Sequence, residues 1–148
     1  MSKAIDNQID HFLSAHQLKK TAIRCEVLNL YLSKPYALSQ HDVELSLSKK
    51  EFDRITLYRT LKTFEECGII HKVYNTSGVA KYAICGDACN HEGHTDEHAH
   101  FNCMKCENTY CLPSVTAPKI SVPKGFKSMN FTYNIDGVCE TCVQKGKK

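Results

Sequence analysis

The chain has 148 residues, 42% of them hydrophobic and 24% charged, with a formal net charge of +3 and nine cysteines. This length allows one ordinary core or two small ones, and no apolar run is long enough to cross a membrane. Because the first residues do not resemble a signal peptide, we expect a cytoplasmic protein with no membrane partner. In that reducing compartment an odd number of cysteines favours metal binding over disulfides. The small net charge does not by itself indicate a nucleic-acid partner.

The first half of the chain has the apolar spacing of a small helical domain. Side chains at helical intervals predict a first helix over residues 5–14. A second helix is predicted over residues 22–32, with Thr21 as its N-cap. Ser39 and Asp42 have the spacing of a capping box, so a third helix should begin at Ser39.

A fourth helix is predicted over residues 54–67, with Asp53 as its N-cap, a buried apolar stripe and a polar outer face. The outer face carries Thr56, Tyr58 and Arg59, which can donate hydrogen bonds to phosphates or base edges. Two β-rich runs, at residues 69–74 and 79–84, follow as a hairpin. This order of elements is typical of a winged helix-turn-helix whose fourth helix enters the major groove. An ordinary helical bundle with a polar outer face is the alternative.

The second half of the chain changes in composition. Strands are predicted over residues 98–103, 108–112 and 129–135, and the three prolines between residues 113 and 123 leave room for only a short helix. The expected fold is α+β: a winged-helix DNA-binding domain at residues 1–84, a histidine-rich hinge loop at 85–97, and a small α/β dimerisation and metal-binding domain at 98–148.

Two C-x-x-C pairs in the second half, Cys103 with Cys106 and Cys139 with Cys142, suit a tetrahedral structural zinc with four thiolate ligands, one zinc per chain. A redox-active pair is the alternative, but such a pair usually opens a helix after a strand, whereas polar, turn-like sequence follows both pairs here. In the hinge loop, Cys89, His91 and His94 could join Cys85 in a local metal cluster. A solvated linker is the alternative for that loop.

Several motifs together resemble the ferric uptake regulator family. The run Ile55-Thr56-Leu57-Tyr58-Arg59-Thr60-Leu61 is similar to the family's T-V-Y-R-x-L signature. Gly68-Ile69-Ile70, the H-x-H motif before the first C-x-x-C pair, and the closing Gly137-Val138-Cys139 also match, from about Lys19 onward. The resemblance implies a metal-sensing transcriptional repressor that binds operator DNA as a homodimer. The proline-rich segment at 113–123 departs from the family's usual dimerisation helix.

The resemblance also implies roles for individual residues at the DNA. Lys19 matches a minor-groove residue, although a lone surface lysine is the simpler interpretation. Thr21 and Arg24 match residues near backbone phosphates. Tyr58 and Arg59 match the recognition-helix pair, in which the tyrosine packs on a thymine methyl and the arginine meets a purine edge or phosphate. With Thr56 these residues form the expected DNA-binding set.

The sensing site implied by the resemblance is that of the zinc uptake regulator subfamily. Its ligand positions fall on His71, Cys85, His98 and His100, a sulfur-and-nitrogen set suited to a second, regulatory zinc in each chain. Iron- and peroxide-sensing members place a carboxylate and a histidine where this chain has Ala83 and a residue near Ala37. A further family site would fall on Glu97, Ala99 and Phe131 and is expected to be missing.

The predicted function is therefore a zinc-responsive repressor that binds palindromic A·T-rich operators of metal-uptake genes. An iron-, manganese- or peroxide-sensing regulator of the same family is the first alternative. A zinc-binding or thiol redox protein without DNA binding is the alternative from another class. The sequence supplies no substrate pocket or oxyanion donor for a zinc enzyme, so we expect no catalysis and no small organic substrate.

Overall fold

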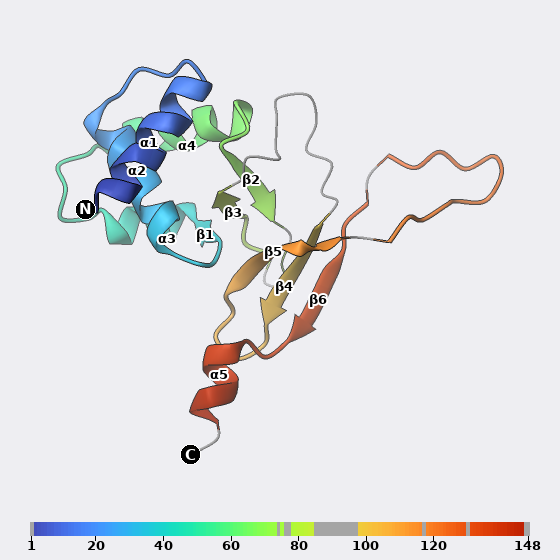
Figure 1. The fold of residues 1–148 in the computed structure, drawn as a ribbon. Helices are drawn as coiled ribbons and strands as arrows, with labels where there is room; N and C mark the ends of the chain where they lie inside the picture. Colours follow the sequence, from blue (N-terminus) through green and yellow to red (C-terminus); the bar gives the residue numbers. More distant parts are fainter. Residues whose placement is uncertain are drawn as a thin grey trace.

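The computed structural model describes residues 2–73, 75, 78–84, 98–116, 118–129 and 131–146. Figure 1 shows a helical N-terminal unit with a small sheet, a second sheet that forms the C-terminal unit, and a long arm projecting from that second sheet. This arrangement is the α+β winged-helix architecture that the sequence predicts. The elements in chain order are α1 (Lys3–Ala15), α2 (Ala22–Ser33), β1 (Leu38–Ser39), α3 (Gln40–Ser46), α4 (Arg54–Glu66), β2 (Ile70–Val73), β3 (Lys81–Ile84), β4 (His98–Cys103), β5 (Thr109–Thr116), β6 (Asn134–Gly137) and α5 (Glu140–Lys145).

The helix starts of the N-terminal unit follow the predicted caps. The Thr21 side chain accepts a hydrogen bond from the Arg24 amide at the start of α2. Ser39 and Asp42 form the full capping box of α3, each side chain bonding the other residue's backbone amide. Asp53 caps α4 by accepting from the Thr56 amide at 2.9 Å. Such caps satisfy amides that otherwise have no partner in the first helical turn.

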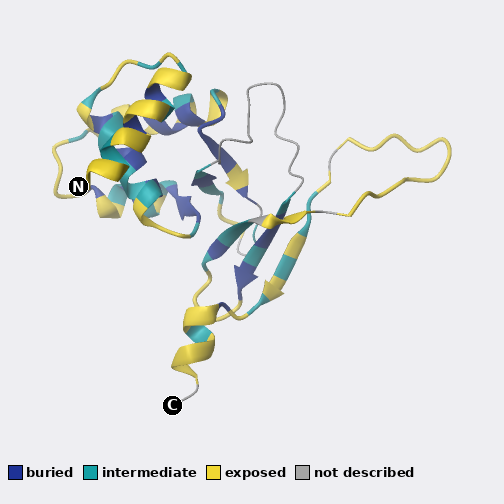
Figure 2. Ribbon diagram, viewed as in Figure 1, coloured by how far each residue is buried: buried dark blue, intermediate teal, exposed yellow. Residues whose placement is uncertain are grey.

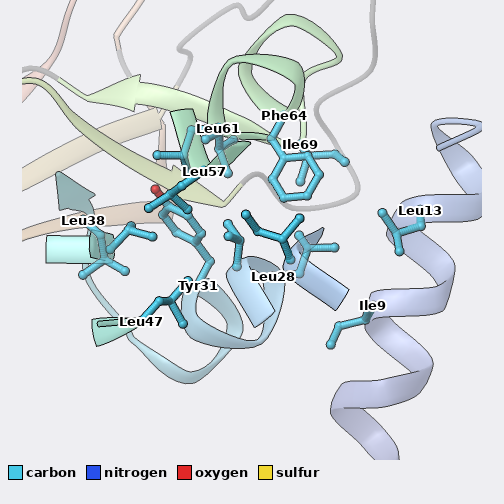
Figure 3. Close-up of a cluster of buried hydrophobic side chains, with 14 residues drawn as sticks. Ile9, Leu13, Leu28, Tyr31, Leu38, Leu47, Leu57, Leu61, Phe64 and Ile69 are labelled. Atoms are coloured by element: carbon cyan, nitrogen blue, oxygen red, sulfur yellow. The ribbon is translucent and has the colours of Figure 1, made fainter. Parts of the chain in front are cut away.

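One hydrophobic core holds the N-terminal unit together. Figure 2 shows the inner faces of its helices buried and their outer faces exposed. Figure 3 shows the Tyr31 ring of α2 packed among apolar side chains from α4 and from the start of β1, including Leu57 and Leu38. Val27, Leu28 and Phe64 are fully buried in the same cluster. Burial of large apolar side chains at this density fixes α4 against α2 and so defines which face of α4 stays exposed.

The small sheet of the N-terminal unit has the strand order β1-β3-β2. Strands β2 and β3 are antiparallel, with His71 paired to Ala83. The turn between these strands is only partly described, but the pairing is that of a wing hairpin. No helix among the described residues has the length and apolar character needed to cross a membrane.

The sheet of the C-terminal unit has the order β5-β4-β6. Strand β4 runs antiparallel to β5 and parallel to β6, and the β4–β5 register shifts between His98 and Ala99. The strand predicted over residues 129–135 is placed too early, because the ladder with β4 begins only at Asn134. Strand β5 runs on to Thr116, into the proline-rich segment. The sequence also did not predict α5, which begins at the second C-x-x-C pair.

Between β5 and β6 the chain forms a projecting segment, residues 118–129 and 131–133, termed the arm (Figure 1, orange). At its tip the Phe126 amide donates to the Pro123 carbonyl at 3.0 Å, and Gly125 has a φ of 90°, as the third position of a type II turn requires. The arm's large apolar side chains are 39% to 83% exposed. They are Ile120, Val122, Phe126, Met129 and Phe131.

Candidate metal centres and DNA-binding surface

The four cysteines of the two C-x-x-C pairs meet in one place, termed the four-cysteine cluster. Cys103 ends β4, Cys106 follows in the next turn, Cys139 is the N-cap of α5 and Cys142 lies within α5. Their sulfur atoms all lie within 4.8 Å of one another, and the Sγ atoms of Cys106 and Cys139 are 3.8 Å apart. The ligands of a tetrahedral zinc lie roughly 3.3–3.8 Å apart, given metal–ligand distances of about 2.0–2.3 Å. The cluster therefore fits one tetrahedral ion.

The thiols of this cluster differ in pKa, and backbone amides lower some of these pKa values. They lower the pKa of Cys103 to about 6, the largest contributions coming from the amides of Cys106 and Cys139, of which the Cys139 amide donates to the sulfur at 3.3 Å. Desolvation and the neighbouring thiols raise the pKa of Cys142 to about 12. Four crowded thiols cannot all ionise unless a cation balances them. A divalent cation held by the four sulfurs would supply that balance.

A second cluster lies where the two units meet, and it is termed the hinge cluster. It consists of His71 from β2, His98 and His100 from β4, and Cys111 from β5. The Cys111 sulfur lies 2.7 Å from His98 Nε2 and 3.8 Å from His71 Nε2. The Nε2 atoms of His71 and His100 are 3.4 Å apart. Three imidazoles and one thiol are thus arranged as a four-ligand set.

The strand geometry explains why these four side chains converge. His98 and His100 are two residues apart on β4, so both point to the same side of the sheet. Cys111 is the registered partner of His100 across the antiparallel β4–β5 pair, and directly paired side chains lie about 5 Å apart. His71 is the only member that comes from the N-terminal unit, and it is 96% buried, with 4% of its surface exposed. A metal held here would therefore join the two units.

The structure brings together three of the four predicted sensor ligands and adds one. Cys85, predicted as the fourth ligand, lies outside the described residues, as do the alternative loop ligands Cys89, His91 and His94. Cys111 was missed because it belongs to no C-x-x-C pair. The signal was present, however, since two predicted strands joined by a short turn pair antiparallel and bring residue 111 opposite His100. Within the described part of the chain, the four-cysteine and hinge clusters are the groups that could hold a metal.

The predicted DNA-binding residues gather around one hollow of about 510 Å³ between the start of α2 and the outer face of α4. Lys19, Thr21 and Arg24 line one side, and Thr56 and Arg59 line the other. The Arg24 guanidinium donates to the Lys19 carbonyl at 2.7 Å, which holds this corner in shape. The sixth predicted residue, Tyr58, is half exposed on α4. The surface combines positive charge with short hydroxyl donors, as contacts to phosphates require.

Comparison with known proteins places this geometry in a family. The model of the ferric uptake regulator family matches residues 15–130. The chain belongs to this family. The ferric uptake regulation protein of Neisseria meningitidis is 30% identical over 138 residues, covering 88% of this chain and 90% of that protein. The corresponding protein of Neisseria gonorrhoeae is also 30% identical over the same length and coverage.

Solved structures of family members share the fold. A zinc uptake regulator in complex with zinc and DNA aligns over 100% of both chains with a TM-score of 0.66 and 21% sequence identity. A zinc-bound manganese uptake regulator aligns over 88% of this chain and 98% of its own, with a TM-score of 0.60 and 17% identity. Members of this family are metal-responsive transcription regulators rather than enzymes. The sequence's prediction of a non-catalytic regulator is therefore confirmed.

Proposed function

We propose that this protein is a zinc-responsive, dimeric transcriptional repressor of the zinc uptake regulator type, acting in the cytoplasm on A·T-rich palindromic operators of metal-uptake genes. The observation that carries the proposal is the hinge cluster. One of its ligands, His71, belongs to the unit with the recognition helix, and the other three belong to the sheet. A metal bound by all four residues restricts the angle between the units.

That angle matters because the operator has two half-sites. In a two-fold dimer the hinge angle sets the distance between the two α4 helices, which must match half-sites about one helical turn apart. Without metal the units sample more orientations, and DNA binding must bear the cost of ordering them. Metal at the hinge cluster therefore raises DNA affinity.

The ligand chemistry supports zinc as the sensed metal. Three imidazoles and a thiolate form a four-ligand set of intermediate softness, which suits a tetrahedral zinc better than manganese(II) or iron(II). Ala83, at the position where iron-sensing members carry a carboxylate, and Ala37, near the position of their histidine, are buried next to the cluster and offer no donor. Iron or manganese sensing is the second candidate, because relatives that are 30% identical are ferric uptake regulation proteins.

The thiolate of the hinge site has two candidates in the sequence. Cys111 is in place within the described residues. Cys85 directly follows β3 and is the ligand that the family resemblance implies. We propose Cys111 as the sulfur ligand, with Cys85 as a fifth or exchanging ligand. A separate site built from Cys89, His91 and His94 is the alternative.

We assign the four-cysteine cluster a structural zinc, one in each chain. Its ligands come from the end of β4 and the start of α5, so the ion fastens the chain's last helix to the sheet. When bound, the zinc supplies a closed tetrahedral crosslink without an open position for chemistry. Binding there is coupled to folding of the C-terminal unit.

A homodimer is supported by the arm. Family members bind DNA as dimers, and the arm exposes five large apolar side chains on a single protomer. An aromatic side chain buries about 150–250 Å², so covering the arm supplies a substantial part of the roughly 800 Å² per partner in a stable interface. The arm points away from the N-terminal unit (Figure 1), so pairing through it leaves α4 free for DNA.

At the DNA we propose separate roles for the two sides of the hollow. Arg59 and Tyr58 on α4 contact base edges and a thymine methyl. Thr21, Arg24 and Thr56 contact backbone phosphates, and Lys19 reaches the adjacent minor groove. The three cationic residues then supply most of the salt-dependent part of binding.

The test combines metal content with DNA binding. Purified protein is expected to carry one zinc per chain that resists mild chelation and to bind a second zinc reversibly. Affinity for an A·T-rich palindromic duplex should rise when the second zinc binds, and less with iron(II) or manganese(II). DNA affinity that responds to iron(II) but not to zinc would replace the zinc assignment with the second candidate. Binding that responds to no metal would refute metal-responsive repression.

A further inference from the structure

A second connection between the units contains no metal ligand. The Ala37 amide, just before β1, donates to the Thr109 carbonyl at 2.7 Å. The Lys81 ammonium on β3 donates to the Glu107 carbonyl, also at 2.7 Å. The rings of Tyr36 and Tyr110 meet edge to face, with centroids 6.1 Å apart and planes at 80°. Each of these contacts joins the N-terminal unit to the short segment 107–110.

This segment lies between the two metal-ligand clusters. It begins directly after Cys106 of the four-cysteine cluster and ends directly before Cys111 of the hinge cluster. The turn that carries Cys106 is closed by the Glu107 amide, which donates to the Cys103 carbonyl at 3.0 Å. Glu107 has a positive φ of 61°, an uncommon conformation for this residue type. The position of the segment therefore depends on the shape of the cysteine turn.

Burial makes the contact at Ala37 specific. Ala37 is 2% exposed and packs with Val73 and Ala83, against which Cys111 is placed. A buried amide left without an acceptor costs about 1–3 kcal/mol, so the Ala37 amide favours the orientation in which Thr109 faces it. That same orientation brings His71 up to Cys111 and His100.

We propose that residues 107–110 form a latch that favours the metal-binding orientation among those that the N-terminal unit samples before metal binds, and that the four-cysteine cluster fixes the position of this latch. Tyr36 and Lys81 are then positioning residues for the hinge cluster, although neither is a ligand. The structural metal site influences sensing through six consecutive residues, 106–111. The part of this inference that concerns Zn(II) affinity rests on the proposed function, whereas the existence of the latch does not.

The test is a double variant, Tyr36→Ala with Lys81→Met, in protein that keeps the zinc of the four-cysteine cluster. Amide hydrogen exchange at Ala37, measured without metal at the hinge cluster, should become at least about 10-fold faster because the latch opens more often. Affinity of the exchangeable site for Zn(II) should fall about 3- to 10-fold, as expected from losing contacts of modest strength.

The controls separate positioning from general destabilisation. Tyr36→Phe with Lys81→Arg keeps the ring pair and the cation. This variant should show wild-type Ala37 exchange and wild-type Zn(II) affinity. Lys72→Met removes a lysine from the neighbouring strand β2, where the side chain is exposed, and should leave both unchanged.

Two outcomes overturn the inference. Unchanged Ala37 exchange in the double variant shows that there is no latch. Faster exchange with unchanged Zn(II) affinity shows that the latch does not position the hinge ligands. If wild-type protein binds no exchangeable zinc, the proposed function fails, and the Ala37 exchange still decides whether the latch exists.

Discussion

The four-cysteine cluster and the hinge cluster use similar residue types but are built differently. All ligands of the first come from the C-terminal unit, two from a strand end and turn and two from the start of α5. The ligands of the second come from three strands in two sheets, and only His71 crosses between the units. A metal in the first cluster stabilises one unit, whereas a metal in the second changes how two folded units sit together. In the proposed function, the location of the ligands in the fold, more than their chemistry, distinguishes the structural site from the sensing site.

The largest effect is expected from breaking the four-cysteine cluster. Cys139→Ser should lose the tightly bound zinc and lower Tm by more than about 10 °C, because loss of a structural metal is among the few changes that cost over roughly 4 kcal/mol. Metal analysis and a thermal melt measure this directly. Cys25→Ser, which removes a half-buried thiol outside both clusters, is the matched control. A zinc-free Cys139→Ser protein that melts like wild type would show that the site is not structural.

Removing the hinge thiol should affect sensing and leave folding intact. Cys111→Ser is expected to keep one zinc per chain and the wild-type Tm. Its affinity for the exchangeable zinc should fall by about 100-fold or more, because changing even an outer-shell partner of a metal ligand costs about 10–100-fold. Its DNA affinity should no longer rise with zinc. Isothermal titration with Zn(II) and a DNA-binding titration give the two numbers.

The same Zn(II) and DNA titrations on Cys85→Ser show whether Cys111 or Cys85 supplies the sulfur ligand. If Cys111→Ser responds normally and Cys85→Ser does not, Cys85 is the ligand and the proposed set must change. If only substitutions of Cys89, His91 or His94 abolish the response, the sensing site lies in the loop.

A substitution at the DNA surface should separate DNA contact from metal binding. Arg59→Ala is expected to weaken operator binding by about 5- to 150-fold, since a base-edge contact is worth about 1–3 kcal/mol, with zinc content unchanged. Arg54→Ala is the matched control on the same helix, because that side chain pairs with Glu44 at 3.1 Å. Equal losses in the two variants would argue against a specific role for Arg59.

The smallest effect on stability should come from mild chelation. Removing only the exchangeable zinc is expected to lower DNA affinity while Tm changes far less than in Cys139→Ser, because both units keep their cores. Parallel melting curves and DNA titrations at increasing chelator concentration show whether DNA affinity is lost before Tm falls. Simultaneous loss of both metals and of the folded state would mean that the two clusters are not functionally distinct.

The sequence predicts much of this architecture because local rules dominate the N-terminal unit. The caps at Thr21, Ser39 and Asp53 and the apolar stripe of α4 determine helix starts and faces without reference to distant contacts. The two C-x-x-C pairs are equally local, and their four sulfurs do meet.

The remaining features depend on pairing between distant segments. Cys111 becomes a candidate ligand only through its register with His100. Strand β6 begins where a parallel partner, β4, is available and not where the alternation of apolar residues begins. Helix α5 has six residues and no buried side chain. Its sequence therefore lacks the apolar periodicity from which a helix can be predicted. Its place next to the cysteine turn is a tertiary feature.

The exposed apolar side chains of the arm affect the steady-state amount of the protein in a cell. If the arm is the dimer interface proposed above, a newly made chain exposes the arm's apolar side chains until it pairs with a second copy. Exposed apolar segments of this kind are recognised by chaperones and proteases, and modest differences in protection change protein abundance several-fold. We expect unpaired protomers to be degraded faster than paired ones. The steady level of the protein would then rise more steeply than its rate of synthesis, because pairing depends on the concentration of both copies.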